Sequence, residues 1–321
     1  MSVYTSVEPA QLEQFLARYE LGKLQQFSAI ASGITNTNYY LDTEAGRFVL
    51  TLYEHHSDDE LDYMLGLQQH LVKRSVHCSE PVMDRRGDLF SILNQRPAAI
   101  IHRLRGQVQP EPESLHCAMV GTELARFHLA GQDYPGIRPN PRGIDWIIAV
   151  TDMLDANLDA SDRKLIKATL QATRQFDLDG LPLGAIHADL FHDNALFIDK
   201  ALGGILDFDY ACRDSFVFDI AVLLNDWCIG SRGELINSRV NATLEAYQRQ
   251  RRLEAIEIDA LPLMLGIAAL RFWLSRLHDK TFPLSGELTF VKSPDSFRDM
   301  LVLRSSQQNE IAKLLLTHRQ R

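Results

Sequence analysis

The sequence predicts an α+β protein built as two lobes, and three observations lead to this class. Short apolar runs separated by turn residues occupy the first third of the chain. Helical periodicity dominates the remainder, and one segment with strand character, 184–209, interrupts it. We therefore predict a small β-rich N-lobe over 1–100, a hinge over 101–106 and a larger, mainly helical C-lobe over 107–321.

The N-lobe opens with a helix and continues mainly as strands. A Glu-Pro pair stands before Leu12 and Phe15, which predicts a short amphipathic helix over 8–20. The turn TEAG at 43–46 joins two apolar runs into a predicted hairpin. The other elements predicted here are strands at 28–30, 39–42, 47–53, 89–93 and 98–104 and a helix at 58–73.

Helical patterns in the C-lobe are clearest in two segments. Val120, Leu124 and Phe127 share one stripe of a helix predicted over 114–130. A second helix is predicted over 268–280. Between them, short apolar runs and glycines predict a small β-insertion.

Composition and charge narrow the functional classes. The chain has 321 residues, 45% of them hydrophobic and 23% charged, as is usual for a globular protein. A net charge of −9 with no basic patch argues against a nucleic-acid partner. The N-terminus does not resemble a secretory signal, and the longest apolar run, 261–270, is too short to span a bilayer. Four cysteines without a CxxC pair predict reduced thiols, so we expect a cytoplasmic protein with no membrane partner. The oligomeric state is not predicted.

The segment 187–194, HADLFHDN, carries the strongest chemical signal. It matches the spacing H-x-D-x-x-x-x-N, in which the Asp accepts a proton from the substrate hydroxyl and the Asn binds Mg²⁺. A loop of this length directs both side chains into one pocket. We therefore predict Asp189 as the catalytic base and Asn194 as a metal ligand for phosphoryl transfer from ATP.

A second carboxylate, Asp207, follows in the string LDFD. The interval predicts a short hairpin, with strands over 195–198 and 204–207, that returns Asp207 to the loop. Its position corresponds to the Asp of a D-F-G motif, which binds the Mg²⁺ that bridges the phosphates. An H-x-D pattern alone more often marks a turn-forming Asp. Together, the H-x-D, Asn194 and Asp207 after the hairpin predict a Mg-ATP site.

These motifs resemble the aminoglycoside phosphotransferase and choline kinase group of protein-kinase-like enzymes. Within that group, nearly the full length of the chain resembles the bacterial homoserine kinases. The resemblance implies the two-lobed protein-kinase-like fold, with ATP bound between the lobes. It rests on HADLFHDN and on SGITNTNY at 32–39, RFVLTLYE at 47–54, LGLQQHL at 65–71, DFDYAC at 207–212, NDWC at 225–228 and ALRF at 269–272.

The resemblance also implies nucleotide contacts in the N-lobe. It assigns 33–38 to a phosphate-covering loop, in which a glycine allows close backbone approach and polar side chains donate to phosphate oxygens. Without the resemblance, the same segment fits a polar hairpin turn. The implied ATP contacts are Gly33, Thr35, Asn36, Asn38 and, beside the adenine at the hinge, Ile101.

One position departs from most kinases of this fold. They place a Lys on the third strand, paired with an acid on the following helix, whereas this chain has Thr51. Glu60 or Asp62 would hold the place of the acid without its partner. The homoserine kinases of this fold resemble this chain in having Thr there. Arg85, Arg86 or a second Mg²⁺ are the candidates to replace the missing charge.

Further residues are predicted to support the loop or to bind the acceptor. The resemblance gives His187 and Asp219 supporting roles, with an ordinary helix N-cap as the alternative for Asp219. Asp226 lies seven residues after Asp219 and shares its helix face. An acceptor with an ammonium and a carboxylate needs an acid and an arginine, for which Arg271 and Arg276 are candidates. Surface or inter-helix pairing is the alternative for each. The predicted substrate contacts are His192, Asp209, Asp226, Trp227 and Arg271.

Two functional classes follow. The first is an ATP:L-homoserine O-phosphotransferase that makes O-phospho-L-homoserine for threonine biosynthesis; choline, an aminoglycoside or a thio-sugar stay open as acceptors. The second is an ATP-binding pseudokinase, which Thr51 favours. Intact Asp189, Asn194 and Asp207 argue against it, because a protein that only binds ATP has no need of a base.

Overall fold

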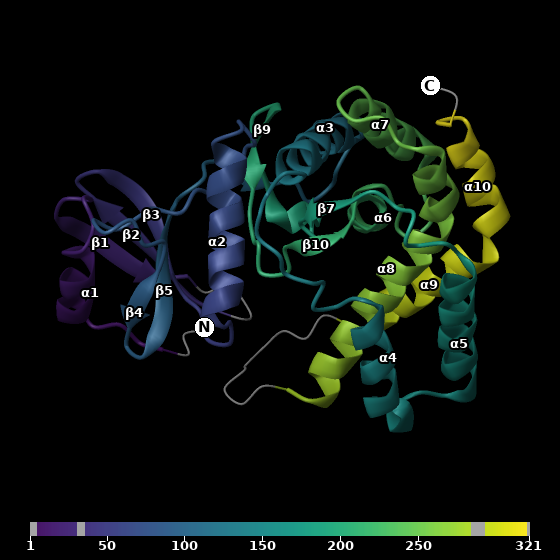
Figure 1. Ribbon diagram of the computed structural model, residues 1–321, viewed down its shortest axis with the longest axis horizontal. Coiled ribbons are helices and arrows are strands. Elements are labelled where there is room, and N and C mark those ends of the chain that lie inside the picture. The colour runs from purple at the N-terminus through teal and green to yellow at the C-terminus, as the bar shows by residue number, and fades with distance from the viewer. Residues whose placement is uncertain (1–4, 31–35, 284–292, 320–321) are drawn as a thin grey trace. The chain divides into compact units, whose positions relative to one another are not determined.

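The computed structural model describes residues 5–30, 36–283 and 293–319. They form two compact units that divide between Arg105 and Gly106 (Figure 1). The first unit is rich in strands and the second is mainly helical, so the predicted α+β class is confirmed. The functions predicted for the two lobes and for the hinge stay predictions.

The first unit is a five-stranded antiparallel sheet with two helices. Its strands lie in the order β1-β2-β3-β5-β4. The predicted hairpin is present as β2 and β3, with Thr43 paired to Gly46. Gly46 has a φ of 144°, a region that favours glycine. The elements are α1 (Pro9–Leu16), β1 (Leu24–Ala29), β2 (Thr37–Thr43), β3 (Gly46–Leu52), α2 (Asp58–Val72), β4 (Ser91–Leu93) and β5 (Arg96–His102).

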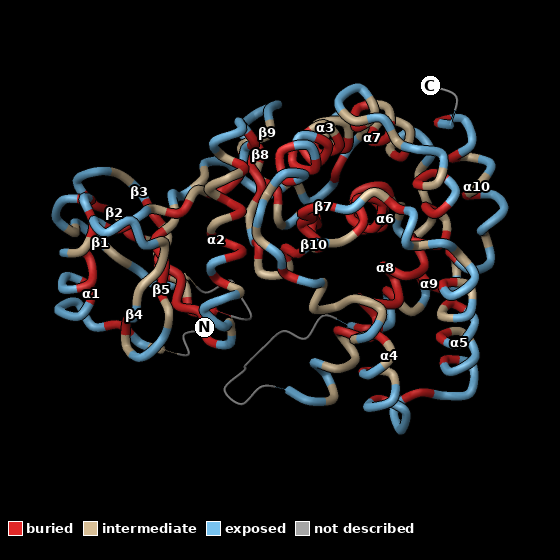
Figure 2. The backbone as a smooth tube through the Cα atoms, viewed as in Figure 1, coloured by how far each residue is buried: buried red, intermediate tan, exposed pale blue. Residues whose placement is uncertain are grey.

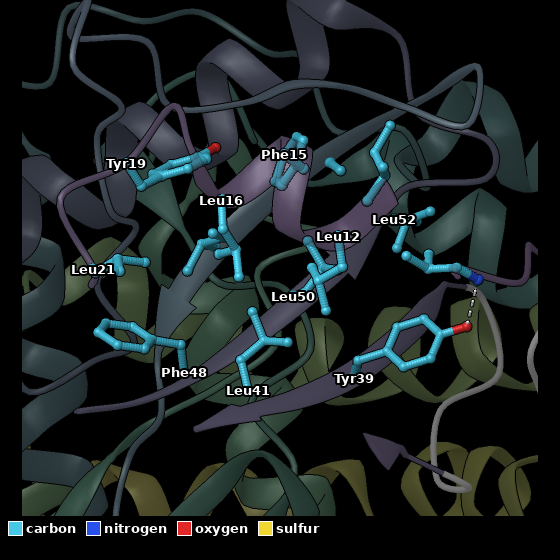
Figure 3. Close-up of a cluster of buried hydrophobic side chains, with 14 residues drawn as sticks. Leu12, Phe15, Leu16, Tyr19, Leu21, Tyr39, Leu41, Phe48, Leu50 and Leu52 are labelled. Atoms are coloured by element: carbon cyan, nitrogen blue, oxygen red, sulfur yellow. Dashed lines mark hydrogen bonds between the residues drawn. The ribbon is translucent and has the colours of Figure 1, made fainter. Parts of the chain in front are cut away.

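One face of this sheet buries its side chains against α1. Residues of β2 alternate between buried and half-buried, as the period of a strand requires. Figure 3 shows the resulting cluster, in which the Val7 N–H donates to the Tyr39 hydroxyl at 3.2 Å. The cluster includes Leu12, Phe15 and Leu16 of α1 and Tyr39, Leu41, Phe48, Leu50 and Leu52 of the sheet.

The second unit is built from helices around two small sheets. β7 pairs with β10, and β6, β8 and β9 form the other sheet. The elements are β6 (Gln107–Val108), α3 (Ser114–Gly131), α4 (Ile144–Met153), α5 (Ala160–Gln175), β7 (Leu183–Ile186), β8 (Ala195–Ile198), β9 (Ala201–Ile205), β10 (Cys212–Ser215), α6 (Phe216–Trp227), α7 (Asn237–Gln248), α8 (Ala255–Thr281), α9 (Asp295–Ser306) and α10 (Gln308–Leu316).

Helix α6 is the centre of the second unit. It packs along α8 and against β7, while α3 packs along α7. Figure 2 shows α6 coloured as buried over nearly its whole length. Gly121 permits the close approach of α3 to α7, because a Cβ there would lie 2.6 Å from the Thr243 carbonyl oxygen.

Several element bounds differ from those predicted. The first helix ends at Leu16, where a turn begins. The second strand of the hairpin, β9, ends at Ile205 and leaves Asp207 beyond the ladder. The helix predicted over 268–280 is the C-terminal half of the longer α8.

All four cysteines are buried, and none of them forms a disulfide. No helix within the described ranges has both the length and the apolar content needed to cross a bilayer.

Candidate active site

The predicted catalytic loop, 187–194, connects β7 to β8 within the second unit. A single 3-10 turn, His192–Asn194, leads into β8, and the tight β8–β9 hairpin returns the chain. The Leu206 N–H then donates to the Asn194 carbonyl at 2.9 Å. The hairpin therefore brings Asp207 back to the loop, as the spacing predicts.

The loop itself holds Asp189 and Asn194 together. Nδ2 of Asn194 donates to the Asp189 carbonyl at 2.8 Å and to its Oδ2 at 3.3 Å. The Phe191 N–H donates to the same carbonyl at 2.8 Å. These bonds use the amide nitrogen of Asn194 and leave its oxygen outside them. The loop thus presents a carboxylate beside an amide oxygen.

Asp207 supplies the second carboxylate. Its backbone is left-handed, with a φ of 61°, a conformation that Asp accepts more readily than most residues. The Asp209 N–H donates to its Oδ1 at 3.3 Å. Loss of hydration, and then the charges of Asp209 and Asp193, raise the pKa of Asp207 to about 7. A cation bound here would relieve the repulsion among these carboxylates.

The donor set fits Mg²⁺ shared with a phosphate ligand. A carboxylate and an amide oxygen are hard donors of the kind that Mg²⁺ prefers, and the ion usually completes its shell with water and phosphate oxygens. Within the described ranges, no group of three or more His, Cys, Asp and Glu side chains could hold a metal by itself. The assignment of Asn194 and Asp207 as ligands therefore stays a prediction that involves the nucleotide.

Asp219 holds the backbone of the loop just before Asp189. The N–H groups of His187 and Ala188 each donate to one of its carboxylate oxygens at 2.8 Å. Ala188 has a φ of 62°, which is strained for a residue with a Cβ, and these bonds stabilise it. Ser215 is the N-cap of α6, so the alternative interpretation of Asp219 as that cap is wrong.

A buried histidine supports Asp219 in turn. His128 on α3 donates from Nε2 to Asp219 Oδ2 at 3.1 Å and accepts at Nδ1 from the Tyr247 hydroxyl at 2.7 Å. Burial lowers the pKa of His128, so the ring is neutral and its two bonds assign the tautomer. Burial alone would raise the pKa of Asp219, but the hydrogen bonds that it accepts from the His128 ring and from the His187 backbone N–H lower it. No motif marks His128 or Tyr247, and the sequence analysis did not find them.

His187 links the backbone of Asp189 to that of Leu206, just before Asp207. Its ring is buried, which lowers its pKa and keeps it neutral. Nδ1 accepts the Asp189 N–H at 3.3 Å, and Nε2 donates to the Leu206 carbonyl at 2.8 Å. The ring also lies 5.1 Å from that of Phe208. One side chain thus bonds to the backbone of Asp189 and to that of Leu206, which directly precedes Asp207.

The end of α6 supports the loop from another direction. The backbone N–H of His192 and its Nδ1 lie 2.6 and 2.8 Å from Asp226 Oδ2. Trp227, which is fully buried, donates from Nε1 to the Leu190 carbonyl at 3.0 Å. Asp219 and Asp226 therefore do share a helix face toward the loop. Substrate contacts by His192, Asp226 and Trp227 stay predictions.

Two arginines reach the same region from distant elements. Arg138, which the sequence analysis did not identify, donates from Nη1 to the carbonyls of Asp209 and Ala211 at 2.8 and 2.9 Å. Arg271 on α8 is buried, and its Nη1 lies 3.7 Å from Asp189 Oδ1. Among the predicted substrate contacts, Arg271 therefore lies beside Asp189, and Asp209 lies two residues after Asp207.

The implied phosphate-covering segment is only partly described. Gly33 and Thr35 lie outside the described residues. Asn36 Oδ1 accepts the Glu54 N–H at 3.3 Å, and Asn38 Oδ1 accepts the Thr51 hydroxyl at 2.7 Å. Both amide oxygens thus bond within the first unit, and the ATP contacts stay predictions.

Glu60, a candidate for the helix acid, and Arg85, a candidate to replace the missing lysine charge, both have local partners. Glu60 accepts from the backbone and hydroxyl of Ser57 and caps α2. Arg85 donates to the Ala17 carbonyl at 3.1 Å. Ile101, predicted beside the adenine, pairs with Val49 in the sheet.

Sequence comparison relates the chain to known phosphotransferases. Residues 26–253 match the phosphotransferase enzyme family. A homoserine kinase of Methylobacillus flagellatus is 45% identical over 301 residues, covering 94% of each chain. A homoserine kinase of Parvibaculum lavamentivorans is 40% identical, covering 92% of this chain and 94% of its own length.

Solved structures show the same fold at low sequence identity. An amicoumacin kinase in complex with AMP-PNP and Ca²⁺ is similar with a TM-score of 0.71 at 15% identity, covering 95% of this chain and 94% of that one. A microcompartment-associated aminopropanol kinase is similar with a TM-score of 0.65 at 17% identity, covering 98% and 99%. The protein-kinase-like fold of this group is therefore the fold of this chain.

Proposed function

Because the chain belongs to the phosphotransferase enzyme family, in the group formed by the homoserine kinases, we propose that it phosphorylates L-homoserine with ATP. The product is O-phospho-L-homoserine, an intermediate of threonine biosynthesis. Identities of 39–45% to homoserine kinases over nearly the whole chain support this acceptor. We place the reaction in the cytoplasm, and the four free thiols fit a reducing compartment.

One arrangement carries the proposal: Asp189 is held beside Asn194, and the hairpin returns Asp207 to the same loop. A base and a metal-binding pair are the parts that phosphoryl transfer requires. The buried bonds of Asp219 to His128 and to the N–H groups of His187 and Ala188 fix the backbone immediately before Asp189, which fits a base that must be held in position.

Each of these residues has its own role in the proposed reaction. Asp189 orients the acceptor hydroxyl and takes its proton as the oxygen attacks the γ-phosphorus and the bond to the ADP oxygen breaks. Asn194 Oδ1 and the Asp207 carboxylate would hold Mg²⁺, which would neutralise charge on the phosphates. His187 and Asp219 keep the backbone of the loop in the geometry that presents these atoms.

The direct test measures ADP release from Mg-ATP with a panel of acceptors. The panel contains L-homoserine, D-homoserine, L-serine, L-threonine, choline, kanamycin and methylthioribose. Turnover that depends on L-homoserine, and on no other member to a similar extent, is expected. Turnover with another member would keep Asp189 as the base and reject the acceptor. Failure to bind Mg-ATP in a titration would reject the kinase.

A further inference from the structure

Arg271 is a buried cation whose hydrogen-bonding groups are only partly used. Its side chain is 3% exposed, and Nη1 lies 3.7 Å from Asp189 Oδ1, longer than a hydrogen bond. Its buried Nη2 has no hydrogen-bond partner in the described part of the chain. An unpaired polar group is costly to bury, and a charged one more so. A cation in this state at a catalytic carboxylate indicates a binding site for an anion.

Asp189 separates this guanidinium from the predicted metal ligands. Its Oδ1 faces Arg271, whereas its Oδ2 lies 3.3 Å from Asn194 Nδ2. We expect Mg²⁺ and the phosphates on the Asn194 side. The anion at Arg271 would then lie on the other side of the base, where an acceptor must approach to deliver its proton. The geometry thus favours an anionic group of the acceptor over a phosphate of ATP.

A second guanidinium approaches the same place through Tyr210. The guanidinium carbon of Arg271 lies 4.6 Å from the centre of the Tyr210 ring, and that of Arg142 lies 5.9 Å from it. Arg142 also stacks on Trp146 at 4.3 Å, and the described residues provide it with no carboxylate partner. Two cations around one aromatic ring repel each other, and a shared anion would relieve that repulsion.

Arg276, the other arginine considered for the acceptor, is engaged elsewhere. Its Nη1 donates to the Ser293 carbonyl at 3.2 Å and to the Ser296 hydroxyl at 2.9 Å. Its guanidinium carbon lies 4.4 Å from the centre of the Phe297 ring. These contacts orient Arg276 toward the start of α9. Of Arg142, Arg271 and Arg276, the first two are therefore better placed to bind an anion.

We propose that Arg271 and Arg142 bind the carboxylate of an amino-acid acceptor, and that this pair selects such acceptors over amino alcohols that lack a carboxylate. The inference rests on the proposed kinase function. A three-carbon chain joins the carboxylate of homoserine to its hydroxyl, so a carboxylate at Arg271 places the hydroxyl within reach of Asp189. Neither arginine takes part in the proton transfer, which ends on Asp189. Arg142 was not among the residues predicted from the sequence.

The test compares L-homoserine with 3-aminopropan-1-ol, which is homoserine with its carboxylate replaced by hydrogen. kcat and KM are measured for both acceptors, and KM for ATP, in the wild type, Arg142→Ala and Arg271→Lys. Arg142 is half-buried, so its truncation tests the proposal even if the buried Arg271 variant folds poorly. Arg232→Ala is the matched control, because that side chain is 88% exposed.

The wild type is expected to prefer homoserine strongly. Each site variant should lower kcat/KM for homoserine by about 10- to 100-fold, mainly through KM, because a charge-assisted hydrogen bond to the carboxylate is lost or weakened. The loss for aminopropanol should be much smaller, so the preference falls, while Arg232→Ala keeps it.

Three results would overturn the inference. Equal losses for both acceptors would show that the arginines only orient Asp189 or support the fold. A raised KM for ATP in place of homoserine would assign the pair to a phosphate. A wild type that uses both acceptors equally well would keep the kinase and reject carboxylate selection. If no acceptor is phosphorylated, the proposed function itself fails, and this inference with it.

Discussion

The sheet of the first unit and the loop 187–194 of the second unit differ in the charged side chains that they carry. At the position where most kinases of this fold carry a lysine, the first unit has Thr51, which is buried and bonded to Asn38. The loop region of the second unit instead gathers carboxylates, among them Asp189, Asp207 and Asp219. We therefore predict that cations bound by the second unit balance the phosphate charge, in place of a lysine of the first.

The two regions also differ in how they are held. Thr51 and Asn38 lie on neighbouring strands and are paired by the hairpin itself. The catalytic loop depends on partners far away in the sequence: Asp219 is 32 residues after His187, and His128 is 91 residues before Asp219. Substitutions in the loop network should therefore have larger effects than substitutions at Thr51.

The largest effect is expected at the base. Asp189→Ala should lower kcat for homoserine by about 100- to 10,000-fold, the usual loss when a general base is removed. Binding of Mg-ATP, measured by titration, should be largely retained, because Asn194 and Asp207 are still present. Asp179→Ala, which changes an exposed carboxylate, is the control. If Asp189→Ala stays within a few-fold of the wild type, Asp189 is not the base.

The next effect concerns the support of the loop. Asp219→Asn replaces one of two accepting oxygens with an NH₂ donor, so the His187 and Ala188 N–H groups cannot both be satisfied. We expect the free energy of unfolding to fall by about 2–3 kcal/mol and kcat to fall with it. Denaturant unfolding and turnover are measured together. Unchanged stability would contradict the role given to this carboxylate.

The pH dependence of the free energy of unfolding should reveal the protonation of His128 that accompanies unfolding. Burial lowers its pKa from 6.5, so the unfolded chain binds a proton that the folded chain does not. Stability therefore rises with pH, and it falls as the pH drops below 6.5 toward the folded pKa. His128→Gln should flatten this slope by up to about 1.4 kcal/mol per pH unit. Denaturant unfolding between about pH 6.5 and 5 measures this slope. His77→Gln, which changes an exposed histidine, is the control. Equal slopes in the wild type and both variants would contradict the prediction.

The smallest effect is expected in the first unit. Thr51→Val removes the hydroxyl that donates to Asn38 and adds no charge, so stability should fall by about 1 kcal/mol. KM for ATP should change only a few-fold, because no charge is lost. Thr122→Val removes a comparable hydroxyl bond from α3 and serves as the control. A large loss of ATP affinity at Thr51 alone would show that this hydroxyl contacts the nucleotide directly, and the contrast between the units would be weaker.

The sequence predicted those parts of the fold in which the interacting residues are near one another in the chain. The β2–β3 hairpin follows from an apolar alternation on either side of a four-residue turn. Asp189, Asn194 and Asp207 come together because a short hairpin has few ways to close. The end of β9 was misplaced, since strand character alone does not show where a ladder ends.

Spacing and periodicity act over a few residues, so the sequence was enough to predict the fold class and the loop 187–194 with its hairpin. Which distant side chains surround that loop depends on tertiary packing. Packing of α3, α6 and α7 brings His128 and Tyr247 to Asp219, and α8 brings Arg271 to Asp189. Residues that meet across distant elements have no fixed spacing in the sequence, so these contacts can be identified only from the folded structure.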